Sequence, residues 1–555
     1  MKIVQNPLPD LEELSLEQQV AQMVVVRASG YLFDHQILYP AWEPPSSLLQ
    51  HWVQDLGVGG VILLGGSAGE LAIRSQQLQD WANIPLLICA DIEEGVGQRF
   101  GGATWFPPPM AIGSIALKDS AQAWQYAEKM GAITAQEALA IGINWVLAPV
   151  VDVNNNPLNP VINVRAFGET PETVSQLASA FIRGAQQYPV LTTAKHFPGH
   201  GDTATDSHID LPVLPHTPPR LATVELPPFE AAIAQGVDAI MSAHLLIPGW
   251  DDRYPATLSR QVLTELLRNC LQFEGLIVTD ALIMGAIANR YGADEAPVMA
   301  VEAGADILLM PVNPETAIQA VCEAVREGRI PRSRIRDSVE RIWKAKDKVT
   351  GQEKGTEASS PNSATQKLFY QLAQPSSLNT VANILQDSLH FGGDLPVSLE
   401  PRNHNNRKLR NLIIVDDALA CDFLGRSTPA VTVPRQLGYE LQLVDRNTPT
   451  LWEDVEASVV TRPTLLQLFI RGNPFRGSVG VTPVAETWVK RLLKTNDLQA
   501  LVIYGSPYVL QQFLPELPND MPYVFSYGQM PQAQAIALDV LFSQSVPINT
   551  FTLFI

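Results

Sequence analysis

The densest group of chemically competent side chains in this sequence lies in the segment HFPGHGDTATDSH, from His196 to His208. Three histidines and two aspartates fall within these thirteen residues. A carboxylate two residues from an imidazole can orient the ring and favour its protonated form, so Asp206 and His208 are suited to general acid catalysis. Glycine, aspartate and threonine in the middle of the segment suit turns, which predicts a loop that brings this pair over a site.

A metal site is an alternative for the same segment. His196 and His200 are spaced like some zinc ligand pairs, and with His208 they would form a metal-dependent hydrolase. That spacing brings two side chains together only on a helix, and Pro198 and Gly199 disfavour a helix here. We therefore expect no metal ligands and no cofactor.

Charged or titratable side chains also stand at or just after the ends of other apolar runs. These positions need an explanation, because burying a charge costs free energy unless the charge is paired or used. Asp91 follows the run LLICA, and Asp280 follows LIVT. The other candidates are Asp152, Arg165, Lys195 and His196, with Glu93, Glu94 and His244 as supporting groups.

Each candidate also has a purely structural interpretation. Asp280 could cap the helix that follows it, and Asp91 could close a turn. Asp152 is expected to satisfy backbone groups in its Asn- and Pro-rich loop, and Arg165 could hold Asp152 in place. Lys195 could belong to a salt bridge at the edge of the core. Convergence on one site would favour the chemical interpretation over these.

Eight short apolar runs alternate with longer helical patterns and must position these side chains. Most contain Val, Ile, Leu and Ala without polar alternation, as strands buried on both faces do. The predicted strands are Gln22–Ala28, Gly59–Leu64, Leu86–Asp91, Ile143–Val150, Val190–His196, Ala239–Leu245, Leu276–Asp280 and Asp306–Met310. Predicted helices include Ala121–Ala140, Pro171–Gln187, Arg260–Leu271 with Ser259 as its N-cap, and Glu315–Arg326. Eight strand–helix units predict an α/β protein with an N-terminal (β/α)8 TIM-type barrel, although two open α/β sheets would give a similar pattern.

A change of composition divides the chain. The stretch Gly351–Lys367 is rich in Ser, Gly, Pro and charge, which predicts an exposed linker between domains at 1–350 and 368–555. Apolar runs return at Asn411–Val415, Leu466–Ile470, Leu501–Tyr504 and Tyr523–Ser526, and helical periodicity follows over Gln532–Leu541. The C-terminal domain is therefore expected to be a smaller α/β domain with an open sheet.

Composition restricts the partners of the protein. A formal net charge of -19 disfavours nucleic acid and anionic membrane surfaces, because the like-charge field repels both. No uncharged apolar run approaches the roughly 18 residues that a membrane span needs. The N-terminus does not resemble a signal peptide, and the scattered cysteines at 89, 270, 322 and 421 are expected to be reduced thiols. A cytoplasmic protein with a small-molecule substrate is expected; its oligomeric state is not predicted.

The segment KHFPGHGDTATDSH closely resembles the signature of family 3 glycoside hydrolases, specifically the bacterial β-N-acetylhexosaminidases of the type used in cell-wall recycling. The segments ADIEEGVGQRF, NPVINVRAF, MSAHLLIP and VTDAL resemble other landmarks of that family, in the same order. The resemblance covers residues 15–345 strongly. It extends more weakly to the C-terminal part, where ALVIYGSPYVLQQF is similar to the second, α/β sandwich domain of the family.

The resemblance implies a role for each matching residue. It implies that Asp280 is the nucleophile of a retaining β-glycosidase and that His208, paired with Asp206, is the acid/base. The groups that hold the sugar would be Asp91, Arg165, Lys195 and His196. It also implies a saccharide substrate with a terminal β-linked N-acetylglucosamine, because β-glucosidases of the family lack the D-S-H acid and use a carboxylate elsewhere.

One departure and four alternatives accompany this resemblance. The family commonly has D-x-E-G-G-R after the third strand, whereas this chain has Val96 in place of the arginine. That difference puts the shape of the loop after Asp91 in doubt. A β-glucosidase or an N-acetylglucosaminide phosphorylase of the same family is the nearest alternative function. A metal-dependent barrel hydrolase and a non-catalytic sugar-binding protein are the more distant ones.

Overall fold

The computed structural model describes residues 8–204, 210–350, 370–397, 408–419, 421–448, 462–472 and 483–542. Two compact units divide these residues, with the main boundary between Leu378 and Asn379. That boundary lies inside helix α14 (Pro375–Asp387). The predicted linker Gly351–Lys367 lies outside the described residues.

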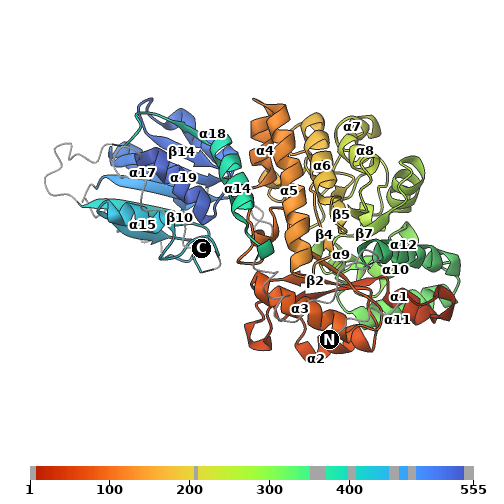
Figure 1. Cartoon of the computed structure of the whole chain (residues 1–555). Helices are drawn as coiled ribbons and strands as arrows, with labels where there is room; N and C mark the ends of the chain where they lie inside the picture. Colours follow the sequence, from red (N-terminus) through yellow and green to blue (C-terminus); the bar gives the residue numbers. More distant parts are fainter. Residues whose placement is uncertain are drawn as a thin grey trace. The chain divides into compact units, whose positions relative to one another are not determined.

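The first unit is a parallel barrel that follows the order of the chain (Figure 1). Its strands are β1 (Val24–Ser29), β2 (Gly60–Leu64), β3 (Leu87–Ala90), β4 (Trp145–Val146), β5 (Leu191–Phe197), β6 (Ala239–Ser242), β7 (Leu276–Thr279) and β8 (Leu308–Leu309). Each strand pairs in parallel with the next from β1 to β7, and β8 pairs with β1. A parallel bridge between Val278 and Ile307 joins β7 to β8 and closes the barrel. The prediction of a TIM-type barrel is confirmed.

Helices surround the strands. They are α1 (Leu16–Ala21), α2 (Ser46–Gln54), α3 (Ala68–Trp81), α4 (Pro109–Ala116), α5 (Ser120–Ala140), α6 (Pro171–Ala185), α7 (Pro218–Val224), α8 (Pro227–Ala234), η6 (Gln261–Cys270), α9 (Gly285–Tyr291), α10 (Glu295–Ala303), α11 (Pro314–Arg326) and α12 (Arg332–Thr350). Helix α5 packs on α6 and α6 on α8, side by side in Figure 1. A Cβ at Gly131 would lie 2.0 Å from the Phe181 carbonyl oxygen, so glycine is required at this contact between α5 and α6.

Local signals explain where several of these elements begin. Thr170 accepts a hydrogen bond from the Thr173 amide and Pro171 occupies the first turn of α6, both common at a helix start. The predicted helix after Ser259 is a π-helix, η6, and the Ser259 hydroxyl accepts from the Val262 amide at 3.3 Å. Short 3-10 turns complete the unit at η1 (Leu11–Glu13), η2 (Asp34–Gln36), η3 (Val96–Gln98), η4 (Asn163–Arg165) and η5 (Ala256–Leu258).

The second unit contains an open six-stranded sheet. In spatial order the strands are β11 (Tyr439–Val444), β10 (Leu409–Val415), β12 (Thr464–Ile470), β13 (Leu498–Gly505), β14 (Tyr523–Ser526) and β9 (His390–Gly392). All pairs are parallel except β14 with β9. The helices of this unit are α15 (Pro429–Gln436), α17 (Pro483–Lys494), α18 (Pro507–Phe513) and α19 (Pro531–Phe542), with a 3-10 turn η7 (Leu514–Glu516). The predicted open α/β sheet is confirmed, and the two edge strands β9 and β11 are additions to it.

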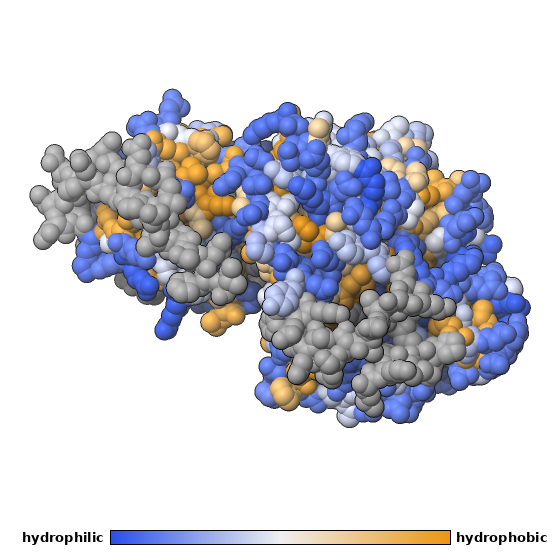
Figure 2. All heavy atoms as spheres, in the orientation of Figure 1, coloured by the Kyte–Doolittle hydropathy of each residue, from blue (hydrophilic) through white to orange (hydrophobic). Residues whose placement is uncertain are grey.

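Burial and surface agree with this division into strands and helices. Strand β12 is buried along its whole length, as a central strand with two covered faces should be. On the visible surface of the barrel unit, hydrophilic residues predominate between smaller apolar patches (Figure 2). None of the helices in the described ranges combines the length and the apolar character that crossing a membrane requires.

Candidate active site

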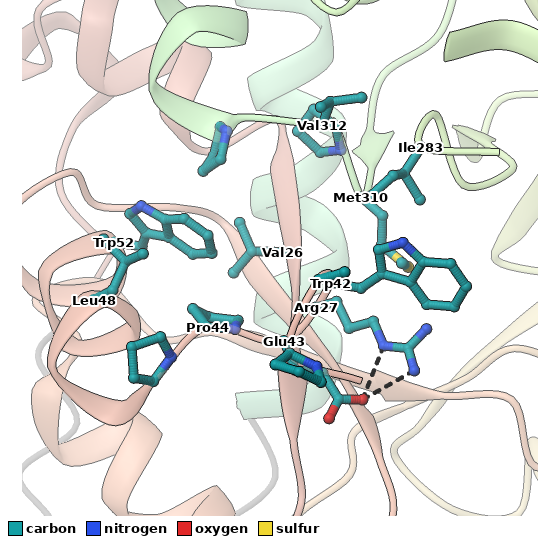
Figure 3. Close-up of a pocket in the computed structure, with 15 residues that line it drawn as sticks. Val26, Arg27, Trp42, Glu43, Pro44, Leu48, Trp52, Ile283, Met310 and Val312 are labelled. Atoms are coloured by element: carbon teal, nitrogen blue, oxygen red, sulfur yellow. Dashed lines mark hydrogen bonds and ion pairs between the residues drawn. The ribbon is translucent and has the colours of Figure 1, made fainter. Parts of the chain in front are cut away.

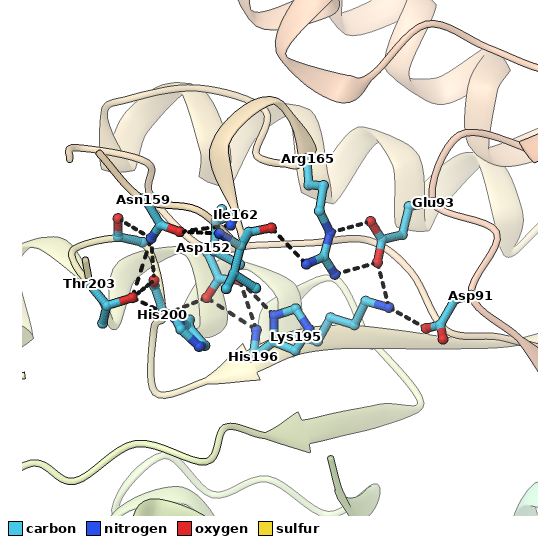
Figure 4. Close-up of polar contacts among 12 residues, drawn as sticks. Asp91, Glu93, Asp152, Asn159, Ile162, Arg165, Lys195, His196, His200 and Thr203 are labelled. Carbon is cyan, nitrogen blue, oxygen red and sulfur yellow. Dashed lines mark hydrogen bonds and ion pairs between the residues drawn. The ribbon is translucent and has the colours of Figure 1, made fainter. Parts of the chain in front are cut away.

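Four charged side chains from three parts of the barrel meet in one network (Figure 4). Lys195, near the end of β5, places its Nζ 2.7 Å from Asp91 Oδ1 and 2.7 Å from Glu93 Oε1. Arg165, at the end of η4, donates from Nη2 to Glu93 Oε1 at 2.8 Å and from Nε to Glu93 Oε2 at 2.9 Å. Glu93 therefore joins two cations, and Asp91 extends the network from the end of β3.

In this network, burial and the neighbouring charges have opposite effects on the pKa values. Burial alone would raise the pKa of Glu93, but the adjacent Arg165 and Lys195 hold it well below its usual value. Burial opposes the charged form of Lys195 too, and Asp91 and Glu93 nevertheless raise its pKa. Glu93 and Lys195 are therefore both ionised at neutral pH.

Asp91 is the most accessible member of the network. Its side chain is 35% exposed, whereas that of Lys195 is 1% exposed. Asp91 Oδ1 accepts from Lys195, and Oδ2 accepts no hydrogen bond from the described residues. The main-chain oxygen of Asp91 accepts from Arg99 Nε at 3.1 Å. A fixed carboxylate with one open oxygen can accept hydroxyl groups of a bound molecule.

Asp152 organises two histidines, His196 near the end of β5 and His200 just after it. Its Oδ2 lies 2.8 Å from His196 Nδ1, and its Oδ1 accepts from the His200 amide at 2.7 Å. Asp152 is fully buried, and its side chain also accepts from the His196 amide. Asp152 therefore satisfies backbone groups at the end of β5 and beyond it, not those of its own Asn- and Pro-rich loop as expected, and it also fixes the orientation of the His196 ring.

His200 is a second oriented imidazole at this site. Its Nδ1 lies 2.8 Å from Thr203 Oγ1, and Asn159 donates to the His200 carbonyl oxygen at 2.8 Å (Figure 4). Burial lowers the pKa of His200 to about 4, although the negative charges of Asp152 and Asp280 act in the opposite direction. His200 is therefore neutral near pH 7. Asp280, which follows β7, is one of the charges that act on His200.

Asp280 follows the last residue of β7 and is half-buried. Its amide donates to the Ser242 carbonyl oxygen at 3.2 Å, and its Oδ1 accepts from the Ala281 amide at 2.7 Å. The next helix, α9, begins only at Gly285 with Met284 as its N-cap, so the helix-cap interpretation of Asp280 is wrong. Nearby, His244 Nε2 contacts the Ala281 carbonyl oxygen at 3.0 Å.

The predicted acid/base pair, Asp206 and His208, lies outside the described residues. The described residues resume on either side of it, up to Ala204 and from Asp210. Asp202 Oδ2 and His216 Nε2, on either side of the pair in the sequence, lie 2.8 Å apart. Within the described ranges, no group of three or more His, Cys, Asp or Glu side chains is arranged to hold a metal ion.

The structure corrects the expected role of two residues. Arg165 is bonded to Glu93 and to the Val161 carbonyl oxygen, not to Asp152. Glu93, expected only as a supporting group, is the centre of the charged network. The only sign of Glu93 in the sequence is its position two residues after Asp91. Its partner Arg165 lies 72 residues after Glu93, so the pairing has no local pattern. Val96 is fully buried, so the position of the missing family arginine belongs to the core.

Comparisons with known proteins agree with this architecture. Residues 15–345 match the glycosyl hydrolase family 3 N-terminal domain, and residues 402–543 match the bacterial glycosyl hydrolase family 3 C-terminal domain. A β-N-acetylglucosaminidase of this family from Paenibacillus sp. str. FPU-7 superposes with a TM-score of 0.76 at 30% identity, covering 96% of this chain and 97% of that one.

Two curated relatives match over shorter lengths. β-Hexosaminidase A of Pseudoalteromonas piscicida is 34% identical over 337 residues, which are 55% of this chain and 56% of the relative. A β-N-acetylglucosaminidase/β-glucosidase of Cellulomonas fimi is 29% identical over 63% of each chain. The chain thus spans about three-fifths of the length of these two relatives. Because the matched models cover both units and the barrel match alone exceeds half of the sequence, the chain belongs to glycosyl hydrolase family 3.

Proposed function

We propose that this chain is a retaining β-N-acetylglucosaminidase that releases terminal β-linked N-acetylglucosamine from small saccharides. The observation that carries the proposal is the position of Asp91, Lys195, His196 and Asp280 at the carboxyl ends of β3, β5 and β7, on one face of the barrel, with Arg165 bound to the same network through Glu93. Catalytic groups of TIM barrels stand at this face, on the ends of different strands.

Each group has a distinct task in the proposed reaction. Asp280 attacks the anomeric carbon and forms a covalent glycosyl ester, while His208 protonates the departing oxygen. His208 then removes a proton from water, which attacks the same carbon and frees Asp280 with the original β configuration. Asp206 orients His208 and favours its protonated form. No metal or cofactor takes part in these steps.

The charged network positions the sugar. Its buried partners fix the Asp91 carboxylate before the substrate arrives, so hydrogen bonds to sugar hydroxyls need little reorganisation. Arg165 and Lys195 act with His196 in the same way, each held by an acid: Glu93 for the two cations and Asp152 for the imidazole. This preorganisation favours a single orientation of the ring against Asp280.

The substrate preference follows from the family branch. The D-S-H tripeptide and the β-hexosaminidase relatives support N-acetylglucosaminides, and saccharides derived from the cell wall are the proposed natural source. The Cellulomonas fimi relative carries both activities in its name, which keeps β-glucosides as the competing substrate. The cytoplasm remains the predicted compartment.

A matched pair of substrates tests the proposal. We expect kcat/KM for 4-nitrophenyl β-N-acetylglucosaminide to exceed that for 4-nitrophenyl β-glucoside at least about 100-fold, because only the former carries the group for which this branch is selective. Activity should persist after exhaustive chelation and should not depend on added phosphate. A faster glucoside would assign the chain to β-glucosidases. Zinc-restored activity would support a metallohydrolase, and a requirement for phosphate would support a phosphorylase.

A further inference from the structure

A cavity of about 190 Å³ lies beside the loops that follow β1, β7 and β8 (Figure 3). Strand β1 contributes Val26 and Arg27, the segment after β7 contributes Ile283, and the segment after β8 contributes Met310 and neighbouring residues. The charged network described above belongs instead to β3, the segment after β4, and β5. Because the strands follow chain order around the barrel, the cavity and the charged network lie on different sides of the same mouth.

The lining of this cavity is mainly apolar and aromatic. Five prolines contribute to it, at 40, 44, 45, 311 and 314. Trp42 and Trp52 lie on opposite sides of the cavity, with Val26 between them (Figure 3). The Trp42 ring stacks on Tyr39 with centroids 5.9 Å apart, and the side chain of Trp42 is partly exposed. Aromatic faces of this kind bind the apolar faces of flat or ring-shaped ligands.

The polar groups of the cavity form a neutral pair. Arg27 donates from Nε at 3.1 Å and from Nη2 at 2.9 Å, and both bonds end on Glu43 Oε1. The guanidinium also lies 5.3 Å from the centroids of both Tyr39 and Trp42, which holds the pair and the aromatic wall together. Glu43 Oε2 accepts no hydrogen bond from the described residues and is the group best suited to a ligand hydroxyl. This balance of charge favours an uncharged ligand.

The cavity lies within reach of a molecule bound at Asp280. Ile283 is three residues after Asp280, and three residues span at most roughly 11 Å. The Ile283 amide donates to the Met310 carbonyl oxygen at 3.1 Å, which joins the two loops that form this wall. A sugar held by Asp91 and Lys195 with its anomeric carbon at Asp280 would direct its other substituent away from that network. The apolar cavity lies on that side of the mouth, away from the charged network.

We propose that this cavity is a subsite for the leaving group of the substrate, and that it selects uncharged leaving groups with an apolar or aromatic face. Its volume is below the roughly 300–1,000 Å³ of pockets for larger ligands, so it holds about one ring. Trp42 and Trp52 contact the faces of that ring, and Glu43 binds a hydroxyl on its edge. This inference rests on the proposed glycosidase function and adds a specificity determinant to it.

Two glycosides that differ only in the leaving group test this subsite. Benzyl and methyl glycosides both release unactivated primary alcohols, but only benzyl alcohol carries a ring. We expect the wild-type ratio of kcat/KM, benzyl over methyl, to be at least about tenfold, and Trp42→Ala to lower this ratio about tenfold because it removes one aromatic wall. Trp42→Phe, which keeps an aromatic face, should retain most of the ratio.

Trp124→Ala is the matched control. Trp124 also lies under an arginine, with Arg183 3.7 Å from its ring centroid, but it belongs to α5 in the helical layer. This variant should leave the ratio unchanged. A ratio that is the same in wild type and Trp42→Ala contradicts the subsite, as does a lowered ratio in Trp124→Ala. The benzyl and methyl glycosides are both made with whichever sugar the enzyme prefers. A preference for glucosides therefore contradicts the proposed function but leaves the subsite test intact. Inactivity on every glycoside contradicts both.

Discussion

The two sides of the barrel mouth differ in the side chains that they present. On the side of β3 to β5, buried acids hold Lys195, Arg165 and His196 in fixed positions, and each charge has a partner. On the side of β8 and β1, prolines and tryptophans form a wall around a single neutral pair, Arg27 with Glu43. Fixed charges discriminate between hydroxyl patterns, whereas apolar walls accept ligands of similar shape. We infer that selectivity for the sugar is strict and that selectivity for the leaving group is graded.

Asp280 stands between the two sides, and its removal should have the largest effect. Asp280→Asn keeps the shape of the side chain but removes the proposed nucleophile, so kcat should fall at least about 1,000-fold. Binding of N-acetylglucosamine, measured by calorimetry, should change less than about threefold. A variant that retains a tenth of the wild-type kcat would show that the nucleophile lies elsewhere and that the two sides do not meet at Asp280.

The two buried glutamates allow a direct comparison of stability. Glu93→Gln should lower the free energy of unfolding by about 3 kcal/mol, because it leaves Arg165 and Lys195 without their shared charge in a buried site. Glu43→Gln should cost about 1 kcal/mol, because Arg27 keeps a hydrogen-bond acceptor and two aromatic rings. Denaturant unfolding of both variants gives the two values. Equal costs, or the reverse order, would refute the contrast between a charged side and an apolar side.

On the charged side, His200 should have a smaller effect on stability, and this effect should depend on pH. The folded pKa of His200, about 4, lies below the usual 6.5 of an imidazole. Between these values the unfolded chain binds a proton that the folded chain does not, so His200 lowers stability as the pH falls from 6.5 towards 4. From about pH 7 to about pH 5, wild type should lose about 1–2 kcal/mol more than His200→Asn.

Thermal unfolding at several pH values gives this difference. His51→Asn is the matched control, because His51 is about half exposed and should not produce the same shift. Parallel pH profiles for wild type and His200→Asn would mean that His200 is not held neutral by burial, and the proposed environment of the site would need revision.

Sequence patterns predicted the charged side of the mouth, because its side chains stand at the ends of strands. Asp91, Lys195 and His196 each stand where a buried strand ends, so hydrophobic runs alone located them. Glu93 could not be assigned in this way, because its role depends on Arg165 across a loop of irregular backbone. The apolar side was not predicted, since Pro40–Pro45 has no periodicity and forms a wall only after β8 and β1 pair.

Similar reasons explain where the observed fold differs from the predicted one. The buried strands of both units are largely apolar runs, which the sequence distinguishes well. Edge strand β11 alternates polar and apolar residues and leaves Leu441 and Leu443 exposed, and β9 has only three residues, so neither forms a buried apolar run. The sequence of η6 predicts a helix but not its kind, because the i→i+5 hydrogen bonds that distinguish a π-helix from an α-helix leave no clear signal in ten residues.

The most direct test of the account is the mass of the intact His208→Ala protein after mixing with an activated aryl β-N-acetylglucosaminide. An activated leaving group needs little protonation, so Asp280 should still be glycosylated, but the covalent ester should hydrolyse slowly without the base. We expect the protein to gain the mass of one sugar residue, and peptide mapping should place it on Asp280. Release of product without any adduct, or an adduct on a different residue, would contradict a retaining mechanism with Asp280 as nucleophile and His208 as acid/base.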